Sequence, residues 1–388
     1  MGVEPSLALF LITFFILYGS LHGYVFLKIK GAFHPTAAAQ AVLILLMAFL
    51  VLTPVLVRVS ERFGYEAPAC ALSYIGYIWM GILLLFFSAS ILLDAYRLLI
   101  HLCGRFTRGD LSFLTPSPLQ IFLIPMLLSL SLNAYGYHEA KNIRTEQVTI
   151  GTAKIPPETG RIRIVQISDV HIGMIVRGGR LEKIVEKVRQ AGPDILVSTG
   201  DLVDGQIDNL MPSARLFEDI RPKYGKFAVT GNHEFYAGIE QAMAFHRSAG
   251  FRVLRGAAVT AAGLINIAGV DDPAGERFGA DRNPTEKKLL TELPRERFTL
   301  LLKHKPVPDR ETLGLYDLQL SGHTHRGQIF PFSLLTALAF PYHAGYFDLP
   351  ERAGLYVSRG SGTWGPPVRF LAAPEVTVID LIYRGEKK

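Results

Sequence analysis

The chain has 388 residues, of which 49% are hydrophobic and 19% are charged, and its formal net charge is +6. Charged residues are unevenly distributed, because they make up 13 of the first 140 residues and 61 of the remaining 248. This distribution excludes a uniformly soluble chain, and the many apolar residues of both parts exclude an intrinsically disordered one. Basic and acidic residues are interleaved, so we expect no nucleic-acid partner.

The apolar N-terminal part, residues 1–140, is predicted to span a membrane four times. Each of four segments approaches or exceeds the roughly 20 apolar residues that a helix needs to cross hydrocarbon. These segments are Ser6–Leu27, Ala37–Val57, Ala71–Leu93 and Leu119–Tyr137. Asp94 and Arg97 follow the third segment three residues apart, and we interpret them as an interfacial ion pair rather than a transport element. We therefore expect an integral membrane protein that contacts membrane lipids.

Basic residues near the ends of these segments bear on the orientation in the membrane. Five fall on one side and four on the other, counting Lys28, Lys30, Arg97, Arg105 and Arg108 against Arg58, Arg62, Lys141 and Arg144. The positive-inside rule therefore leans, by one residue, toward an extracytoplasmic C-terminal part.

The C-terminal part is predicted to be a linker with an entry strand over 141–160 and a folded domain over 161–388. Its first strands are expected at 161–167, 194–199 and 226–230, with helices at 181–190 and 210–220 between them. This alternation of strands and helices predicts an α/β core. Further strands are expected at 147–150, 264–268, 298–302, 318–320, 355–358 and 376–382.

Residues of the types that bind metals follow five of these strands. They are Asp169, His171, Asp201, Asp204, Asn232, His233, His304, His323 and His325. Open α/β sheets bind ligands at the carboxyl ends of their strands, and alternation along extended backbone would direct both members of each Asp-x-His or His-x-His pair to one side. Mixed carboxylate and imidazole ligands suit Mn, Fe or Zn. Each motif is weak alone, but their joint occurrence predicts a metal centre.

These motifs resemble the five sequence blocks of the calcineurin-like metallophosphoesterase superfamily, over about residues 146–383. The blocks are Asp169-x-His171, Gly200-Asp201-x-x-Asp204, Gly231-Asn232-His233-Glu234, His304 and Gly322-His-Thr-His325. The match is closest to the membrane-anchored bacterial branch, which implies the bacterial cytoplasmic (inner) membrane. The resemblance implies a domain built as a β-sandwich flanked by helices, with two divalent or trivalent metal ions (Mn, Fe or Zn).

The resemblance also implies a role for each residue. Asp169, His171 and His325 would hold the first metal, Asn232, His304 and His323 the second, and Asp201 would bridge both. His233 would face the leaving group, with Asp204 orienting its ring. Glu234 stands where many relatives have Asp, beside the ligands. Arg326 stands where this branch often has Gly, so its predicted contact with substrate, like that of Arg369, rests on its positive charge and not on the resemblance.

The expected activity is a hydrolase that cleaves phosphate monoesters, diesters or pyrophosphates by a metal-bridged hydroxide. Its substrate would be a phosphorylated small molecule or a lipid-linked phosphate. The lipid-linked substrate is suggested by the four predicted spans beside the catalytic domain. The alternative is a membrane sensor or transport component whose domain binds phosphate without catalysis. The enzyme is favoured, since a module that only binds would not need His233.

Overall fold

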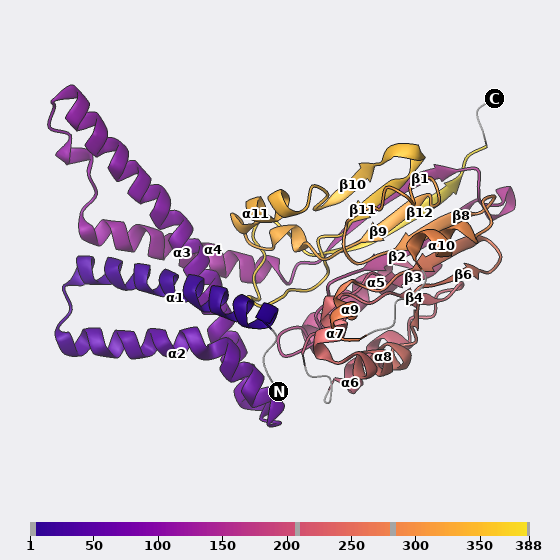
Figure 1. The fold of residues 1–388 in the computed structure, drawn as a ribbon, viewed down its shortest axis with the longest axis horizontal. Coiled ribbons are helices and arrows are strands. Elements are labelled where there is room, and N and C mark those ends of the chain that lie inside the picture. The colour runs from indigo at the N-terminus through magenta and orange to yellow at the C-terminus, as the bar shows by residue number, and fades with distance from the viewer. Residues whose placement is uncertain (1–4, 206–209, 280–284, 386–388) are drawn as a thin grey trace. The chain divides into compact units, whose positions relative to one another are not determined.

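The computed structural model describes residues 5–205, 210–279 and 285–385 (Figure 1). The chain divides into two compact units. One consists of Met1–Tyr137 with Gly365–Val368, and the other consists of His138–Trp364 with Arg369–Lys388. We refer to them as the helical unit and the catalytic unit.

The helical unit contains four long apolar helices. Their bounds are Pro5–Phe33 (α1), Ala37–Arg62 (α2), Glu66–Thr107 (α3) and Pro118–Glu139 (α4). All four contain a stretch that is long and apolar enough to cross a membrane, as the sequence predicts. Helix α3 has 42 residues and continues well past the predicted segment, because Ala, Leu and Arg residues beyond Leu93 also favour helix.

Close packing holds the helical unit together. Gly76 of α3 lies so near α2 that a Cβ atom there would be 2.3 Å from the Thr53 hydroxyl. Small residues at such crossings let helix backbones approach closely in membranes. Buried Tyr18, Leu83 and Phe86 form part of a core that α1 and α3 share with residues of α2 and α4.

The catalytic unit contains two six-stranded mixed sheets, ordered β1-β12-β2-β3-β4-β5 and β10-β11-β9-β8-β7-β6. The strands of the first sheet are Arg144–Thr152 (β1), Glu375–Tyr383 (β12), Arg161–Ile167 (β2), Ile195–Ser198 (β3), Lys226–Ala228 (β4) and Arg252–Val253 (β5). Those of the second are Gly345–Asp348 (β10), Gly354–Val357 (β11), Leu318–Ser321 (β9), Phe298–Leu302 (β8), Ile265–Gly269 (β7) and Ala257–Ala261 (β6). Strands β2, β3 and β4 are parallel, as are β7, β8 and β9.

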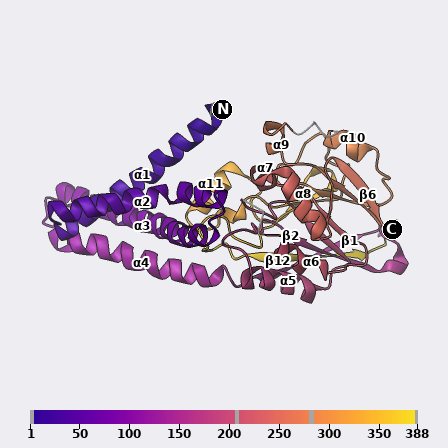
Figure 2. The ribbon, with the colours of Figure 1, turned by 90° about the horizontal axis from the view of Figure 1, so that it is seen from below.

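Apolar side chains fill the space between the two sheets. Ile164 and Val197 of the first sheet share one buried cluster with Leu300 and Leu320 of the second. The opposite faces are covered by helices, with α5 (Gly179–Ala191) and α6 (Met211–Glu218) beside the first sheet (Figure 2). The remaining helices are α7 (Asn232–Ala237), α8 (Ile239–Ser248), α9 (Ala274–Arg277), α10 (Glu286–Thr291) and α11 (Phe332–Ala339). This is the helix-flanked β-sandwich that the resemblance implies.

Candidate metal centre

The predicted site residues lie in loops that follow strands of both sheets. Asp169 and His171 follow β2, Asp201 follows β3, and Asn232 and His233 follow β4 at the start of α7. From the second sheet, His304 follows β8, while His323 and His325 follow β9. Because β2, β3 and β4 are parallel, as are β8 and β9, their carboxyl ends meet at the same edge of the sandwich.

Two groups of side chains converge there. In the first, His171 Nε2 lies 3.1 Å from His325 Nε2, and His325 Nε2 lies 3.4 Å from Asp169 Oδ1. In the second, His304 Nε2 lies 3.1 Å from Asp201 Oδ2 and 3.2 Å from His323 Nδ1. Asp201 Oδ2 is also 3.9 Å from His171 Nε2, so this carboxylate stands between the groups. Each group places its donor atoms within 4.8 Å of one another, as a metal site requires.

The backbone that presents these side chains differs from the sequence prediction. Strand β2 ends at Ile167 and β9 at Ser321, so neither motif pair lies on extended strand. Positive φ angles place five predicted ligands in the left-handed region, namely Asp169 (51°), His171 (53°), Asp201 (51°), His323 (72°) and His325 (48°). Strand alternation is therefore the wrong explanation for the pairs. Left-handed backbone, which costs non-glycine residues free energy and clusters at functional sites, turns the side chains inward instead.

Two motif glycines allow the loops to approach each other. A Cβ atom on Gly322 would lie 1.9 Å from Ser168 Oγ and 2.2 Å from Asp169 Oδ2. A Cβ atom on Gly231 would lie 2.1 Å from Asp201 Oδ1. Any side chain at either position would push a predicted metal-binding carboxylate away.

Electrostatic interactions in the site are strong because the groups are buried. Burial raises the pKa of Asp169 to about 6. Burial lowers the pKa of His171 to about 4 and that of His323 to about 3, so both rings are neutral at pH 7. Against the effect of burial, Asp201 raises the pKa of His304 to about 10. The charge of the buried Asp201 carboxylate is thus balanced by a proton on His304. A bound metal cation would replace that proton as the positive charge.

The donor set fits divalent cations. The buried side-chain oxygen Oδ1 of Asn232 has no hydrogen-bond partner among the described residues. His304 Nδ1 lies 2.8 Å from the carbonyl oxygen of Thr199, the contact that commonly orients a metal-binding imidazole through its other nitrogen. A cation would satisfy the Asn232 oxygen and the buried carboxylates together.

His233 lies beside the two groups and is held by acidic partners. Its Nδ1 is 2.9 Å from Asp204 Oδ1, and its backbone N–H donates to Asp201 Oδ1 at 2.8 Å. Although burial opposes protonation, Asp201 and Asp204 raise the pKa of His233 to about 9. Two exposed aromatic rings border it, since its centroid is 5.3 Å from that of Tyr236 and 5.8 Å from that of Trp364.

Comparisons with known proteins agree with this arrangement. Residues 162–327 match the family model for calcineurin-like phosphoesterases. The chain is 41% identical over 262 residues to a metallophosphoesterase of Aquifex aeolicus, a match that covers 67% of this chain and 100% of the relative. It is 32% identical to a metallophosphoesterase of Campylobacter jejuni, covering 81% of this chain and 84% of the relative. The chain belongs to the metallophosphoesterase family.

As a metallophosphoesterase, the chain is a metal-dependent hydrolase of phosphate esters or anhydrides. It is also 31% identical to a transmembrane protein with a metallophosphoesterase domain from Danio rerio, covering 67% of this chain and 62% of that one. That relative and the four apolar helices identify this metallophosphoesterase as a membrane protein. The individual roles of the site residues stay predictions.

Glu234 is the residue of this metallophosphoesterase whose importance the sequence does not reveal. It is fully buried, and its carboxylate accepts hydrogen bonds from the backbone N–H groups of Gly231 (2.7 Å), Asp201 (2.9 Å), Leu202 (2.8 Å) and Val203 (3.4 Å). The Asp201 and Asn232 loops are thereby joined by one side chain. In the sequence, Glu234 stands out only as the acidic residue that ends the Gly231-Asn232-His233-Glu234 block, and nothing there shows that it joins two loops.

The two predicted substrate arginines lie in different environments. Arg326 has an exposed side chain that makes no hydrogen bond or ion pair with the residues described. Arg369 is fully buried and donates to the carbonyl oxygens of Arg359 (2.7 Å) and His325 (3.1 Å), with Nη2 3.0 Å from His325 Nδ1. Through these contacts Arg369 positions His325. Its contact with substrate stays a prediction.

Proposed function

We propose that this metallophosphoesterase uses two metal ions to hydrolyse a phosphate monoester, phosphodiester or pyrophosphate. The observation that carries the proposal is the convergence, from both sheets, of four imidazoles (His171, His304, His323 and His325) and two buried carboxylates (Asp169 and Asp201). Neutral imidazoles, carboxylates and an amide oxygen suit Mn, Fe or Zn.

Each residue has a defined part in the proposal. Asp169, His171 and His325 would hold one cation, Asn232, His304 and His323 would hold the other, and Asp201 would contribute to both sites. When bound, such a pair supplies positive charge to the phosphoryl oxygens and acidifies water at the site.

His233 is the proposed proton donor to the departing oxygen. Asp204 engages its Nδ1 at 2.9 Å, which leaves Nε2 as the ring atom that can transfer a proton. The pKa of about 9 keeps the ring protonated at neutral pH. The exposed guanidinium of Arg326, next to His325 in the chain, is proposed to contact a phosphoryl oxygen.

The test combines metal analysis with turnover of a chromogenic phosphodiester by the full chain in detergent. We expect two bound metals per chain, with one retained in the double variant His304→Ala/His323→Ala. His233→Ala should keep both metals while losing about 10²- to 10⁴-fold in rate. His138→Ala, which alters an exposed residue near the end of α4, is the control and should match the wild type. Two bound metals without turnover of any phosphate ester or lipid would instead favour the phosphate-binding sensor.

We further propose that the substrate is linked to a lipid. Gly327 belongs to the loop that carries His323 and His325, and helix α11 begins five residues after it. The helix exposes Leu335 (59%) and Leu338 (83%) to solvent. Trp364 beside His233 adds a further exposed apolar surface. Clustered exposed apolar residues near an active site support contact with an acyl chain or a bilayer surface.

Leu338→Ser separates this proposal from the phosphoesterase activity itself. We expect slower hydrolysis of phospholipid in vesicles and unchanged hydrolysis of the soluble chromogenic diester. Val307→Ser, which alters another exposed apolar residue of the catalytic unit, should affect neither. Ready cleavage of soluble diesters with no cleavage of any lipidic phosphate would contradict lipid linkage.

We also propose that the helices lie in a bacterial cytoplasmic membrane with the catalytic unit outside the cytoplasm. The support is the small excess of basic residues at the ends of α1 and α3 that the sequence shows. A C-terminal alkaline-phosphatase fusion should be active and a green-fluorescent-protein fusion dark. The opposite pair of signals would place the catalytic unit in the cytoplasm.

A further inference from the structure

A cavity of about 920 Å³ lies within the helical unit, apart from the metal centre. Residues of α1, α3 and the loop between α3 and α4 line it, including Lys28, Asp94, Arg97, His101 and Arg105. It is located where the apolar part of α3 gives way to charged residues. In a membrane protein, this change of composition marks the level of the lipid headgroups.

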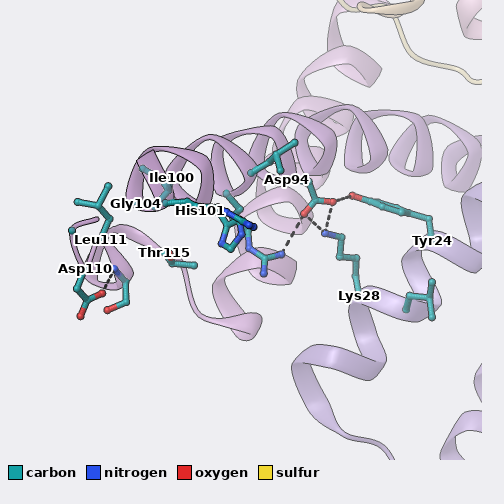
Figure 3. Close-up of a pocket in the computed structure, with 15 residues that line it drawn as sticks. Tyr24, Lys28, Asp94, Ile100, His101, Gly104, Asp110, Leu111 and Thr115 are labelled. Carbon is teal, nitrogen blue, oxygen red and sulfur yellow. Dashed lines mark hydrogen bonds and ion pairs between the residues drawn. The ribbon is translucent and has the colours of Figure 1, made fainter. Parts of the chain in front are cut away.

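Basic side chains form a ladder along one side of the cavity. Arg97, His101 and Arg105 are spaced four residues apart on α3, so they share one face of the helix. Lys28 approaches from α1. We call these four residues the basic ladder. Figure 3 shows Tyr24 and Lys28 directed at Asp94, with His101 and Gly104 farther along α3.

One carboxylate organises the inner end of the ladder without neutralising it. Asp94 accepts from Lys28 Nζ at 2.5 and 2.7 Å and from the Tyr24 hydroxyl at 2.6 Å, and it lies 3.6 Å from Arg97 Nη1. Two cations therefore share one anion. Arg97 Nε is buried without a hydrogen-bond partner among the described residues.

At the end of the basic ladder farthest from Asp94, the positive charge of Arg105 is not balanced by a described acidic partner. Among the residues that the structure describes, Arg105 has no hydrogen-bond or ion-pair partner. Asp110, the second acidic residue of the lining, is engaged by the backbone N–H of Ser112 at 2.9 Å. A cavity with more cations than anions and an unpaired guanidinium nitrogen is suited to a phosphate group.

Apolar residues beside the ladder indicate what carries that phosphate. Leu27 and Leu98 line the cavity and are 66% and 58% exposed. Both belong to helices that are apolar enough to cross a membrane, so their exposed side chains face acyl chains when the helices are inserted. A ligand that satisfies both parts of the lining has an anionic head and an apolar tail.

We propose that this cavity binds the phosphate headgroup of an anionic phospholipid. Arg97 and Arg105 are its principal ligands, with Lys28 and His101 beside them and Asp94 positioning Lys28 and Arg97. Basic pockets between transmembrane helices bind anionic headgroups in this way. The site uses no residue of the metal centre, so it does not depend on the proposed reaction.

The test uses the full chain in nanodiscs that contain equal amounts of phosphatidylglycerol and phosphatidylcholine. Native mass spectrometry after delipidation should show retained phosphatidylglycerol in the wild type and at least about tenfold less in Arg97→Gln/Arg105→Gln, since both principal ligands of the phosphate are then uncharged. Arg58→Gln/Arg62→Gln removes the same charge from the end of α2, outside the cavity lining, and should retain lipid as the wild type does.

Two further measurements separate a lost site from a lost fold and a lipid from free phosphate. Phosphatidylglycerol should raise the melting temperature of the wild type and of the α2 control but not of the ladder variant, while all three should hydrolyse the chromogenic diester alike. Inorganic phosphate should show no saturable binding. Equal lipid retention by both double variants overturns the site, and saturable phosphate binding without lipid retention overturns the assignment to a lipid.

Discussion

At the scale of single residues, the carboxylate of Glu234 controls the spacing of the two loops that carry Asp201 and Asn232. Glu234→Gln would replace one carboxylate oxygen by an amide N–H₂ group. That group is a donor and cannot accept from the backbone N–H groups that now donate to the carboxylate. We expect metal affinity to fall by about 10- to 100-fold, as when other groups that orient ligands are lost. Metal titration monitored by turnover measures this loss.

Glu240→Gln is the matched control for that change, because Glu240 is an exposed glutamate on neighbouring α8. It should bind metal as the wild type does. A Glu234→Gln variant that melts at a lower temperature but keeps normal metal affinity would show that Glu234 supports only the fold.

Gly322 makes a second prediction at this scale, because the site leaves no room for a methyl group there. Gly322→Ala should push both Ser168 and Asp169 away from residue 322. The expected cost is at least about 1 to 3 kcal/mol of stability, the usual range for overpacking, together with loss of activity. Gly179→Ala, at a position with no atom within 4 Å, should lose neither and can gain up to about 1 kcal/mol as a helix residue. Thermal unfolding compares them, and equal melting temperatures would contradict the packing argument.

Among the secondary-structure elements, strands β2 and β12 are joined by a directly paired arginine and aspartate. Arg163 Nε and Nη2 each donate to Asp380 at 2.8 Å. The hydrogen bonds from Arg163 lower the pKa of Asp380 below its ordinary value. The folded pKa is thus below the unfolded one, so the pair stabilises fully above the unfolded pKa of about 4 and loses this effect as the pH falls through the folded pKa.

Asp380→Asn should therefore destabilise the protein by about 1 kcal/mol or less at pH 7, since the pair is only partly shielded from water. The difference in melting temperature from the wild type should stay constant between pH 8 and 5 and shrink below about pH 4. Glu292→Gln, at an exposed position, should show no such difference. A difference that grows on acidification would disprove the assignment.

The elements also show what sequence patterns can predict. Strands β2, β3 and β8 are rich in branched apolar residues and are followed by polar motifs, so both the strands and the motifs after them can be recognised in the sequence. Strands β5, β6 and β10 were not predicted, because they are short and form by pairing with neighbours at or near the sheet edges. The left-handed backbone of the ligand loops and the burial of Arg369 depend on contacts between distant segments, which local patterns do not encode.

At the scale of the whole molecule, the ligands of the proposed metals come from segments that follow strands of both sheets of the catalytic unit. Asp169, Asp201 and Asn232 follow strands of the first sheet, whereas His304 and His323 follow strands of the second. Removal of the metals would leave buried carboxylates that depend on protonated histidine for neutralisation, and this arrangement weakens the contact between the sheets.

Chelation should therefore lower the melting temperature of the catalytic unit. A cation present at 100 times its Kd contributes about 2.7 kcal/mol per site, and this is roughly 5 to 10 °C for a unit of this size. Differential scanning calorimetry of the full chain, with and without chelator, measures the shift. The double variant His304→Ala/His323→Ala should respond less, because it retains one proposed site, while His138→Ala should respond as the wild type does. An equal shift in all three proteins would show that His304 and His323 do not bind the stabilising ion. That ion would then bind outside the proposed second site.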